Sequence, residues 1–384
     1  MSKLVRNLFI FNFLIVLIAC GHSVAGPLYK THTLFVFYDA GETLALKPVL
    51  DELVEKQSDF KVLVMATART LLKENYTIDL NKECGVKEDV DHVQWERYQN
   101  LSDESLGKVK QCVGADRIIT GMVSKIQFQI AESFKQTSKV CGYYDGLSLP
   151  DPKSTLFSDF LKVLHTVLVP TSEMEKYTKH ISSQSNVKVV GQPTLEVWRT
   201  TLESLEEKSI YKSLSLDMKR KMILYAGGYG EDYEKAFAIF SKASSQLKKY
   251  NVLVSLHPKV DGALESNILK LHGADHVKII PKSISTMYAA KVADLIVTQR
   301  SSVGVQALFA GKSVIYLDVP STTYKNTAIE KKWSPQISDS DEFLAVAKKI
   351  LSNKKSAVKD IYSESGIPKD SKNSILNLIL SKSI

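Results

Sequence analysis

Short apolar runs alternate with longer amphipathic stretches along the first half of the chain. Residues 33–38 (TLFVFY) are rich in aromatic and β-branched side chains, which predicts a strand. Residues 42–56 then place leucine and valine at roughly helical spacing, which predicts a helix. Four more strands are expected between helical patterns, in the stretches FKVLVMA, DRIITGM, KVCGYY and HTVLVP. The Gly-x-Pro break in VKVVGQP ends this half.

The second half repeats this order. Residues 221–230 (KMILYAGGYG) predict a strand and a glycine turn, and residues 231–249 predict a long amphipathic helix. Further strands are expected in the stretches NVLVSLHP, VKIIP, ADLIVT and KSVIYLD. Strands that alternate with helices form parallel βαβ units with helices on both faces of the sheet. We therefore expect an α/β fold with two Rossmann-like domains, whose parallel sheets face each other across a cleft.

This pattern divides the chain into five segments. Residues 1–25 are expected to be a signal peptide or lipoprotein signal, and residues 28–193 an N-terminal Rossmann-like domain. Residues 194–218 are expected to form a linker or hinge, and residues 219–352 a C-terminal Rossmann-like domain. Residues 353–384 are expected to form a helical tail. Ligands of open α/β sheets bind beyond the carboxyl ends of the strands, so the cleft is the expected site.

The first 25 residues have the order of a secretory signal. Two cations in MSKLVR precede the apolar run NLFIFNFLIVLIAC, and SVAG offers small residues for cleavage. Cleavage after Ala25 would give a secreted or periplasmic protein. The stretch LIAC also resembles a lipoprotein box, and cleavage there would make Cys20 the lipidated first residue of a cell-envelope lipoprotein. An uncleaved membrane anchor is a third alternative. We expect an exported protein, with a membrane tether through the N-terminus under the second and third interpretations.

Composition narrows the classes of ligand. The chain has 44% hydrophobic and 24% charged residues and a formal net charge of +8. Its cations are scattered among acids rather than gathered in a basic stripe with aromatic residues, so nucleic-acid binding is not expected. A basic background favours anionic ligands.

The cysteine count permits one disulfide, but the sequence does not show which two cysteines form it. Without Cys20, three remain, namely Cys84, Cys112 and Cys141, and three cysteines cannot all pair within one chain. No Cys-x-x-Cys or Cys/His spacing indicates a metal site, and no metal or other cofactor is expected.

Small polar residues follow the strand that ends near residue 298. In TQRSSVGVQALFAGKSVIY, Ser301, Ser302 and Gly304 lie where a helix begins. Serine is a common helix cap, but free amides and the positive end of the helix dipole also attract anions. Arg300 would add a cation to such an anion site, or lie in solvent.

Two further turns at strand ends are candidate ligand contacts. Gly227, Gly228 and Gly230 permit close approach of the backbone to a ligand, although tight turns need glycine in any case. His257 follows a strand and precedes a proline that fixes the turn, so its imidazole is either a ligand contact or a hydrogen-bonded structural group.

These turns resemble the glycosyltransferase-B superfamily of sugar-nucleotide enzymes. AGETLALKPVLDEL resembles the start of the acceptor domain in that superfamily, and VVGQP resembles the Gly-x-Pro that closes this domain in lipid-A-disaccharide-synthase-like members. LHP and TQRSSVGVQALFAGKSVIY resemble donor-domain motifs of CDP-glycerol glycerophosphotransferases and capsule-sugar transferases. The resemblance implies that His257 and the serine turn lie around the phosphates of the donor. Gln299 and Gln306 stand where those phosphotransferases carry acids. Many glycosyltransferases hold the donor ribose with a glutamate near the position of Gln306, so the resemblance implies that Gln306 contacts the donor, although an amide holds a hydroxyl more weakly than a charged acceptor does.

Transfer with inversion needs a general base near the acceptor hydroxyl. Asp39 and Glu42 follow the first strand and are the candidates, with Asp39 preferred because Glu42 suits a capping role. We expect an exported glycosyltransferase-like enzyme that binds a nucleotide sugar or other nucleotide-diphosphate donor. It would transfer a sugar or polyol phosphate to a glycan or lipid acceptor. The alternatives are a non-catalytic glycan- or anion-binding protein and a sugar-nucleotide 2-epimerase-like enzyme.

The signal pattern predicts a processed N-terminus. Intact-mass analysis of protein from the native host should show a chain that starts at Cys20 with a lipid, or at Gly26 without one. A full-length chain that starts at Met1 and fractionates with the cytoplasm would contradict export.

Overall fold

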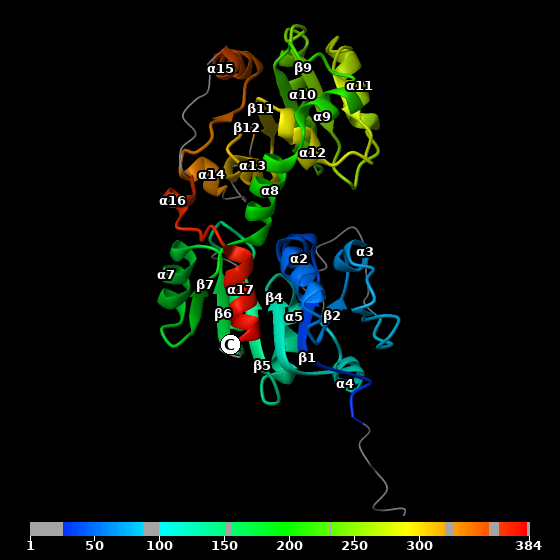
Figure 1. The fold of residues 1–384 in the computed structure, drawn as a ribbon, viewed down its shortest axis with the longest axis vertical. Helices are drawn as coiled ribbons and strands as arrows, with labels where there is room; N and C mark the ends of the chain where they lie inside the picture. The colour runs from blue at the N-terminus through cyan, green and yellow to red at the C-terminus, as the bar shows by residue number, and fades with distance from the viewer. Residues whose placement is uncertain are drawn as a thin grey trace, which may run out of the picture. The chain divides into compact units, whose positions relative to one another are not determined.

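The computed structural model describes residues 26–87, 100–150, 155–230, 232–318, 326–352 and 361–381 (Figure 1). The expected signal segment, with Cys20, and residues 353–360 of the expected tail lie outside the described residues. Among the described residues, no helix is both long enough and apolar enough to cross a membrane.

Seven parallel strands form the first sheet, in the order β3-β2-β1-β4-β5-β6-β7. The strands are β1 (Tyr29–Phe37), β2 (Phe60–Val64), β3 (Thr77–Asp79), β4 (Val113–Gly121), β5 (Lys139–Tyr143), β6 (Thr166–Val169) and β7 (Val187–Val189). The helices between them are α2 (Ala40–Glu55), α3 (Ala68–Leu71), α4 (Asp103–Cys112), α5 (Lys125–Phe134), α6 (Leu156–Leu161) and α7 (Ser172–Ile181). The five strands expected from the sequence are all present, and β3 and β7 are two short additions.

Six parallel strands form the second sheet, in the order β10-β9-β8-β11-β12-β13. The strands are β8 (Met222–Ala226), β9 (Asn251–Ser255), β10 (Lys278–Ile280), β11 (Leu295–Thr298), β12 (Ser313–Leu317) and β13 (Gln336–Ile337). The helices that follow the first sheet are α8 (Pro193–Ser204), α9 (Glu207–Ser213), α10 (Tyr233–Ser244), α11 (Ala263–Leu271), α12 (Thr286–Val292), α13 (Ser302–Phe309), α14 (Thr327–Glu330), α15 (Ser340–Ser352), α16 (Ile361–Ser365) and α17 (Ser371–Leu380). The predicted α/β fold with two parallel sheets is confirmed.

Both faces of the second sheet are buried. Along β8, Met222 and Leu224 belong to one hydrophobic core, and Ile223 and Tyr225 to the other. Successive side chains of a strand point to opposite faces, which explains why each strand reads as a continuous apolar run. Helices α8, α9, α12 and α13 supply side chains to the first core, and α10, α11 and α15 to the second.

The segment that the sequence assigns to a linker is helical. Leu195 and Trp198 of α8 and Ile210 of α9 are buried in the first of these two cores. Helix α17 returns from the far end of the chain to pack against α2 and α8. Lys372 at its start forms an ion pair with Glu52 of α2, with 3.0 Å between Nζ and Oε2.

A disulfide joins Cys84 to Cys112, whose Cα atoms lie 5.2 Å apart. This bond settles the pairing that the sequence leaves open, and Cys141 is buried outside it. The bond links the loop after β3 to the last residue of α4.

The chain folds into two compact units, each made of more than one stretch of sequence. One unit lies within Met1–Asp39 and Asp59–Val140, and the other within Ala40–Ser58 and Cys141–Ile384. The second unit holds α2 together with the whole second sheet. The domain boundaries and the cleft expected from the sequence stay predictions.

Candidate functional site

The carboxyl ends of the second-sheet strands carry most of the residues singled out in the sequence. The glycine turn follows β8, His257 follows β9, and Arg300, Ser301 and Ser302 follow β11. The order β9-β8-β11 places β8 at the point where the strand order reverses, because β9 and β10 lie on one side of it and β11 and β12 on the other. Ligands of open α/β sheets bind at such a switch point.

The glycine turn after β8 is shaped by close packing. The amide of Gly227 donates to the carbonyl of Ser255 over 2.8 Å, and a Cβ on Gly227 would come 2.7 Å from that oxygen. A Cβ on Gly228 would meet the ring of Tyr233 at 3.0 Å, and Gly230 has a φ of +100°. Glycine is required here because the backbone passes close to β9 and α10 and then enters the left-handed region. Contact of this turn with a phosphate stays a prediction.

Two buried polar side chains support this turn from the inside of the unit. The hydroxyl of Tyr233 donates to Oε1 of Glu265 over 2.9 Å, and both side chains are buried. Burial raises the pKa of Tyr233, the neighbouring Tyr225 and Glu265 raise it further, and a hydrogen bond from the Gly228 backbone opposes them. Tyr233 is therefore a neutral phenol that connects the glycine turn to a carboxylate inside the unit.

His257 is held in one orientation. Its ring lies against Tyr229, with 4.4 Å between the ring centroids, and its Nδ1 accepts the amide hydrogen of Lys259 over 3.1 Å. A neutral imidazole with an accepting Nδ1 carries its proton on Nε2. Burial lowers the pKa of His257, and the charges of Lys259 and Lys282 lower it further. The side chain is therefore a neutral hydrogen-bond donor at physiological pH.

Cations surround this histidine and the serine turn. The ammonium of Lys259 lies 4.8 Å from the centroid of the Tyr229 ring, and that of Lys282 donates to the carbonyl of Pro258 over 3.2 Å. Nη2 of Arg300 lies 3.9 Å from a carboxylate oxygen of Asp232. This edge of the sheet therefore favours anions. Tyr229, Lys259 and Lys282 were missed in the sequence, where the only signal was a lysine directly after the His-Pro pair.

The serine turn contains a cap and an exposed first helical residue. Ser301 is the N-cap of α13, and its Oγ accepts the amide hydrogen of Val303 over 3.3 Å. Ser302 is the first residue of the helix and is exposed. The capping interpretation therefore holds for Ser301, and the binding of an anion at this helix start stays a prediction.

Two predicted residues of this motif lie inside the protein. Gly304 is buried, and a Cβ there would come 2.5 Å from Oη of Tyr316 and 2.9 Å from Cγ2 of Thr298. Its lack of a side chain lets α13 lie directly on β11 and β12. Gln299 is only 2% exposed. Gln306 is half-buried on α13.

Carboxylates lie at strand ends of the first sheet. Asp39 is half-buried at the end of β1, within the first unit. Glu42 is completely buried in the first turn of α2, within the second unit. A buried carboxylate suits the structural role considered for Glu42, so Asp39 remains the preferred base.

A third carboxylate, Asp145, was missed in the sequence. It follows β5 in the second unit, and a Cβ on Gly41 of α2 would meet its Oδ2. The pKa values of Tyr143 and Tyr144 are raised by burial and then by the charge of Asp145. The Asp-Gly pair after the strand KVCGYY was the available signal, but Asp-Gly is also a common turn sequence.

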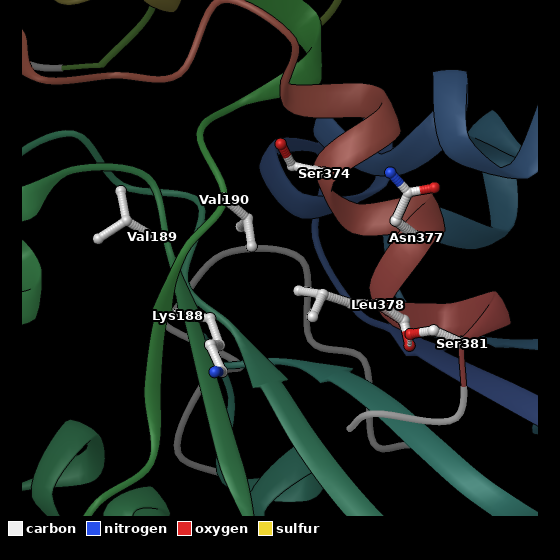
Figure 2. A pocket seen from close by; sticks show the side chains of 7 residues that line it. All are labelled: Lys188, Val189, Val190, Ser374, Asn377, Leu378 and Ser381. Atoms are coloured by element: carbon white, nitrogen blue, oxygen red, sulfur yellow. Dashed lines mark hydrogen bonds between the residues drawn. The ribbon is translucent and has the colours of Figure 1, made fainter.

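A hollow of about 370 Å³ lies elsewhere in the second unit, between β7 and α17 (Figure 2). Its lining residues are Lys188, Val189, Val190, Ser374, Asn377, Leu378 and Ser381. None of the residues predicted from the sequence lines it, and it contains no carboxylate or histidine. Within the described parts of the chain, no three His, Cys, Asp or Glu side chains gather as metal ligands would.

Solved structures share this fold. No family model and no curated protein matches the chain. The UDP-GlcNAc 2-epimerase from Methanocaldococcus jannaschii superposes with a TM-score of 0.65 at 15% identity, over 92% of this chain and 99% of that one. The UDP-GlcNAc 2-epimerase from Neisseria meningitidis, bound to UDP-GlcNAc, gives 0.62 at 15% identity, over 92% and 100%. The wall teichoic acid polymerase TagF gives 0.57 at 12% identity, over 91% and 89%. The glycosyltransferase-B fold implied by the sequence resemblance is confirmed.

The surroundings of two helical glycines predict that replacing each by alanine has opposite effects on stability. Gly304→Ala should lower the free energy of unfolding by about 1–3 kcal/mol, because its Cβ overlaps Tyr316 and Thr298. Gly107→Ala in α4 is the matched control, since a Cβ there meets nothing within 4 Å. This change should raise stability by about 0.5–1 kcal/mol. Urea unfolding measures both. Equal effects at the two positions would contradict the close packing of α13.

The surroundings of His257 predict its titration. Because the unfolded chain protonates this histidine at higher pH than the folded chain does, stability should fall as the pH drops below about 6.5. An NMR titration of the ring should give a pKa below that value. Tyr229→Ala should raise the pKa by exposing the imidazole, and Lys259→Met should raise it by removing a charge. A wild-type pKa above the ordinary value would contradict the arrangement.

Proposed function

We propose that this protein is a nucleotide-sugar enzyme that binds the diphosphate of its donor at the carboxyl edge of the second sheet. The observation that carries the proposal is the exposed start of α13 at Ser302, on a sheet edge that also holds a neutral His257 and the cations of Lys259, Lys282 and Arg300. Free amides and the positive end of a helix dipole attract a phosphate. The sheet edge supplies both hydrogen-bond donors and positive charge.

These groups suit the stabilisation of a leaving diphosphate. Negative charge develops on the diphosphate as the bond to the transferred group breaks, and fixed donors and cations stabilise that charge. His257 would donate a hydrogen bond from Nε2 to the diphosphate, and its ring would keep the proton. Asp145, in the same unit as these groups, is a candidate base that would accept the proton of an attacking hydroxyl, and Asp39 stays the base predicted from the sequence. The transferred group would be a sugar, which leaves the nucleoside diphosphate, or a polyol phosphate, in which case the bond between the two phosphates breaks and the nucleoside monophosphate leaves. The acceptor would be a glycan or lipid.

The solved structures support a nucleotide donor. They include an epimerase bound to UDP-GlcNAc, a Staphylococcus aureus MnaA co-structure with UDP, and TagF soaked with CDPG. A second candidate function is 2-epimerisation of a nucleotide sugar. The epimerase structures favour it because the shared fold spans 96–100% of three of those chains.

Incubation with UDP-GlcNAc separates the two candidates. An epimerase converts the sugar nucleotide without an acceptor, whereas a transferase releases UDP only when an acceptor is present. Binding without any conversion, with and without a panel of glycan and lipid acceptors, would favour the non-catalytic binding protein.

We also propose that the protein is exported. The order of charged, apolar and small residues in 1–25 supports export, and so does the Cys84–Cys112 disulfide, because disulfides persist mainly in oxidising compartments. Intact-mass analysis of the N-terminus tests this proposal. An exported enzyme needs a nucleotide donor outside the cytoplasm, so the location also bears on the choice between enzyme and binding protein.

Replacement of Ser302 by aspartate tests the donor site. A negative charge in the first helical turn interacts favourably with the helix dipole, so the variant should keep its stability. The new charge would stand where the diphosphate is expected, and affinity for UDP in calorimetric titration should fall at least about tenfold, or about 1.4 kcal/mol.

Ser172→Asp is the matched control. Ser172 is also the exposed first residue of a helix, α7, behind the hydroxyl N-cap Thr171. This variant should bind UDP as the wild type does. If wild type and Ser302→Asp bind UDP with equal affinity, the helix start is not part of the donor site.

A further inference from the structure

We propose that Gln299 is a positioning residue of the donor site, which holds together the chain segments that follow β8, β11 and β12. This inference rests on the proposed function, because it concerns the residues that present Ser301 and Ser302 to the diphosphate. Its evidence is the hydrogen bonding of one buried amide group.

The amide nitrogen of Gln299 joins two segments far apart in sequence. It donates to the carbonyl of Asp232 over 3.0 Å and to the carbonyl of Asp318 over 3.3 Å. Asp232 lies between the glycine turn and α10, and Asp318 directly follows β12. Gln299 itself is the first residue after β11, so one side chain connects the ends of three strands.

Both acceptors are themselves fixed by further contacts. Asp318 has a φ of +43°, its amide donates to the carbonyl of Ile337, and its carboxylate pairs with Lys235 over 2.9 Å. Asp232 lies beside Arg300 through its carboxylate. The left-handed backbone conformation of Asp318 is uncommon for a residue other than glycine and persists only where its surroundings fix it. Gln299 supplies part of that restraint, and the next three residues are Arg300, Ser301 and Ser302.

The geometry explains why an amide rather than an acid suits position 299. An amide nitrogen has two hydrogens and serves two carbonyl oxygens at once. An ionised carboxylate has none and would be repelled by both oxygens. A protonated carboxyl group could donate to only one of them. At Gln299, this chain therefore has the side chain that its own loops require.

The two hydrogen bonds from Gln299 to the carbonyls of Asp232 and Asp318 are called the brace. Two substitutions test the brace through the pH dependence of UDP binding. Gln299→Met keeps the volume but removes both hydrogen bonds, and should weaken UDP binding about five- to tenfold at every pH. Gln299→Glu keeps one of the two hydrogen bonds at about pH 5.5, where a buried carboxyl group is protonated, and should bind UDP there with an affinity between those of wild type and Gln299→Met. Its affinity should fall further towards about pH 8, where the carboxylate donates to neither carbonyl. Dividing each dissociation constant by the wild-type value at the same pH removes the titration of UDP and His257.

Gln129→Met is the matched control. The Gln129 side chain also braces backbone, since it accepts from the amide of Leu101 over 2.7 Å and donates to its carbonyl over 3.1 Å. Its loss should lower stability without changing the affinity for UDP. A purely structural role for Gln299 predicts the same result for Gln299→Met, and that outcome would overturn the proposal.

Hydrogen exchange without ligand separates this inference from the proposed function. Gln299→Met should speed exchange of backbone amides at 232–235 and 300–303 relative to wild type, whether or not UDP binds. If wild type fails to bind UDP, the proposed donor site is wrong and exchange alone decides whether the brace exists. Unchanged exchange at both segments would overturn the brace.

Discussion

Burial of the second sheet on both faces is the constraint on which the rest of this unit depends. Every side chain of β8 is buried, and those of its first four residues divide between two hydrophobic cores. Charged and hydrogen-bonding side chains therefore have no place along the strands and gather at their ends. Parallel pairing brings those ends to one edge. Residues separated by some 70 positions in sequence, such as Tyr229 and Arg300, consequently reach the same edge without any local signal that relates them.

Several polar groups at this edge are already hydrogen-bonded to other groups of the protein. The Gly227 amide, the Tyr233 hydroxyl and the Gln299 amide all have partners inside the unit. The exposed start of α13 and the ammonium groups of Lys259 and Lys282 remain on the outside. Under the proposed function, support and recognition would thus be divided between different residues, although the sequence groups them in the same short motifs. A substitution in either set would then weaken ligand binding, but only a substitution in the supporting set would also loosen the unliganded protein.

Much of the fold could be predicted because the strands of four or more residues contain continuous apolar runs between amphipathic helices. The three-residue strands β3 and β7 are too short to show a pattern, and the helices at 193–213 were missed because their apolar residues resemble those of an irregular connection. The turn at Ser301 and Ser302 was located correctly. The role of Gly304 could not be predicted, because it depends on Tyr316, which is brought beneath it only by the pairing of β12 with β11. Gln299 and Asp145 were obscure for a related reason, since their neighbours lie far away in sequence.

The ion pair between Glu52 and Lys372 joins residues 320 positions apart. During synthesis, α2 leaves the ribosome about 300 residues before α17 does. Helix α2 must therefore wait, with part of its surface uncovered, until α17 has been made. A chain with this arrangement completes these native contacts late, which leaves the surface of α2 open to chaperones for most of that time.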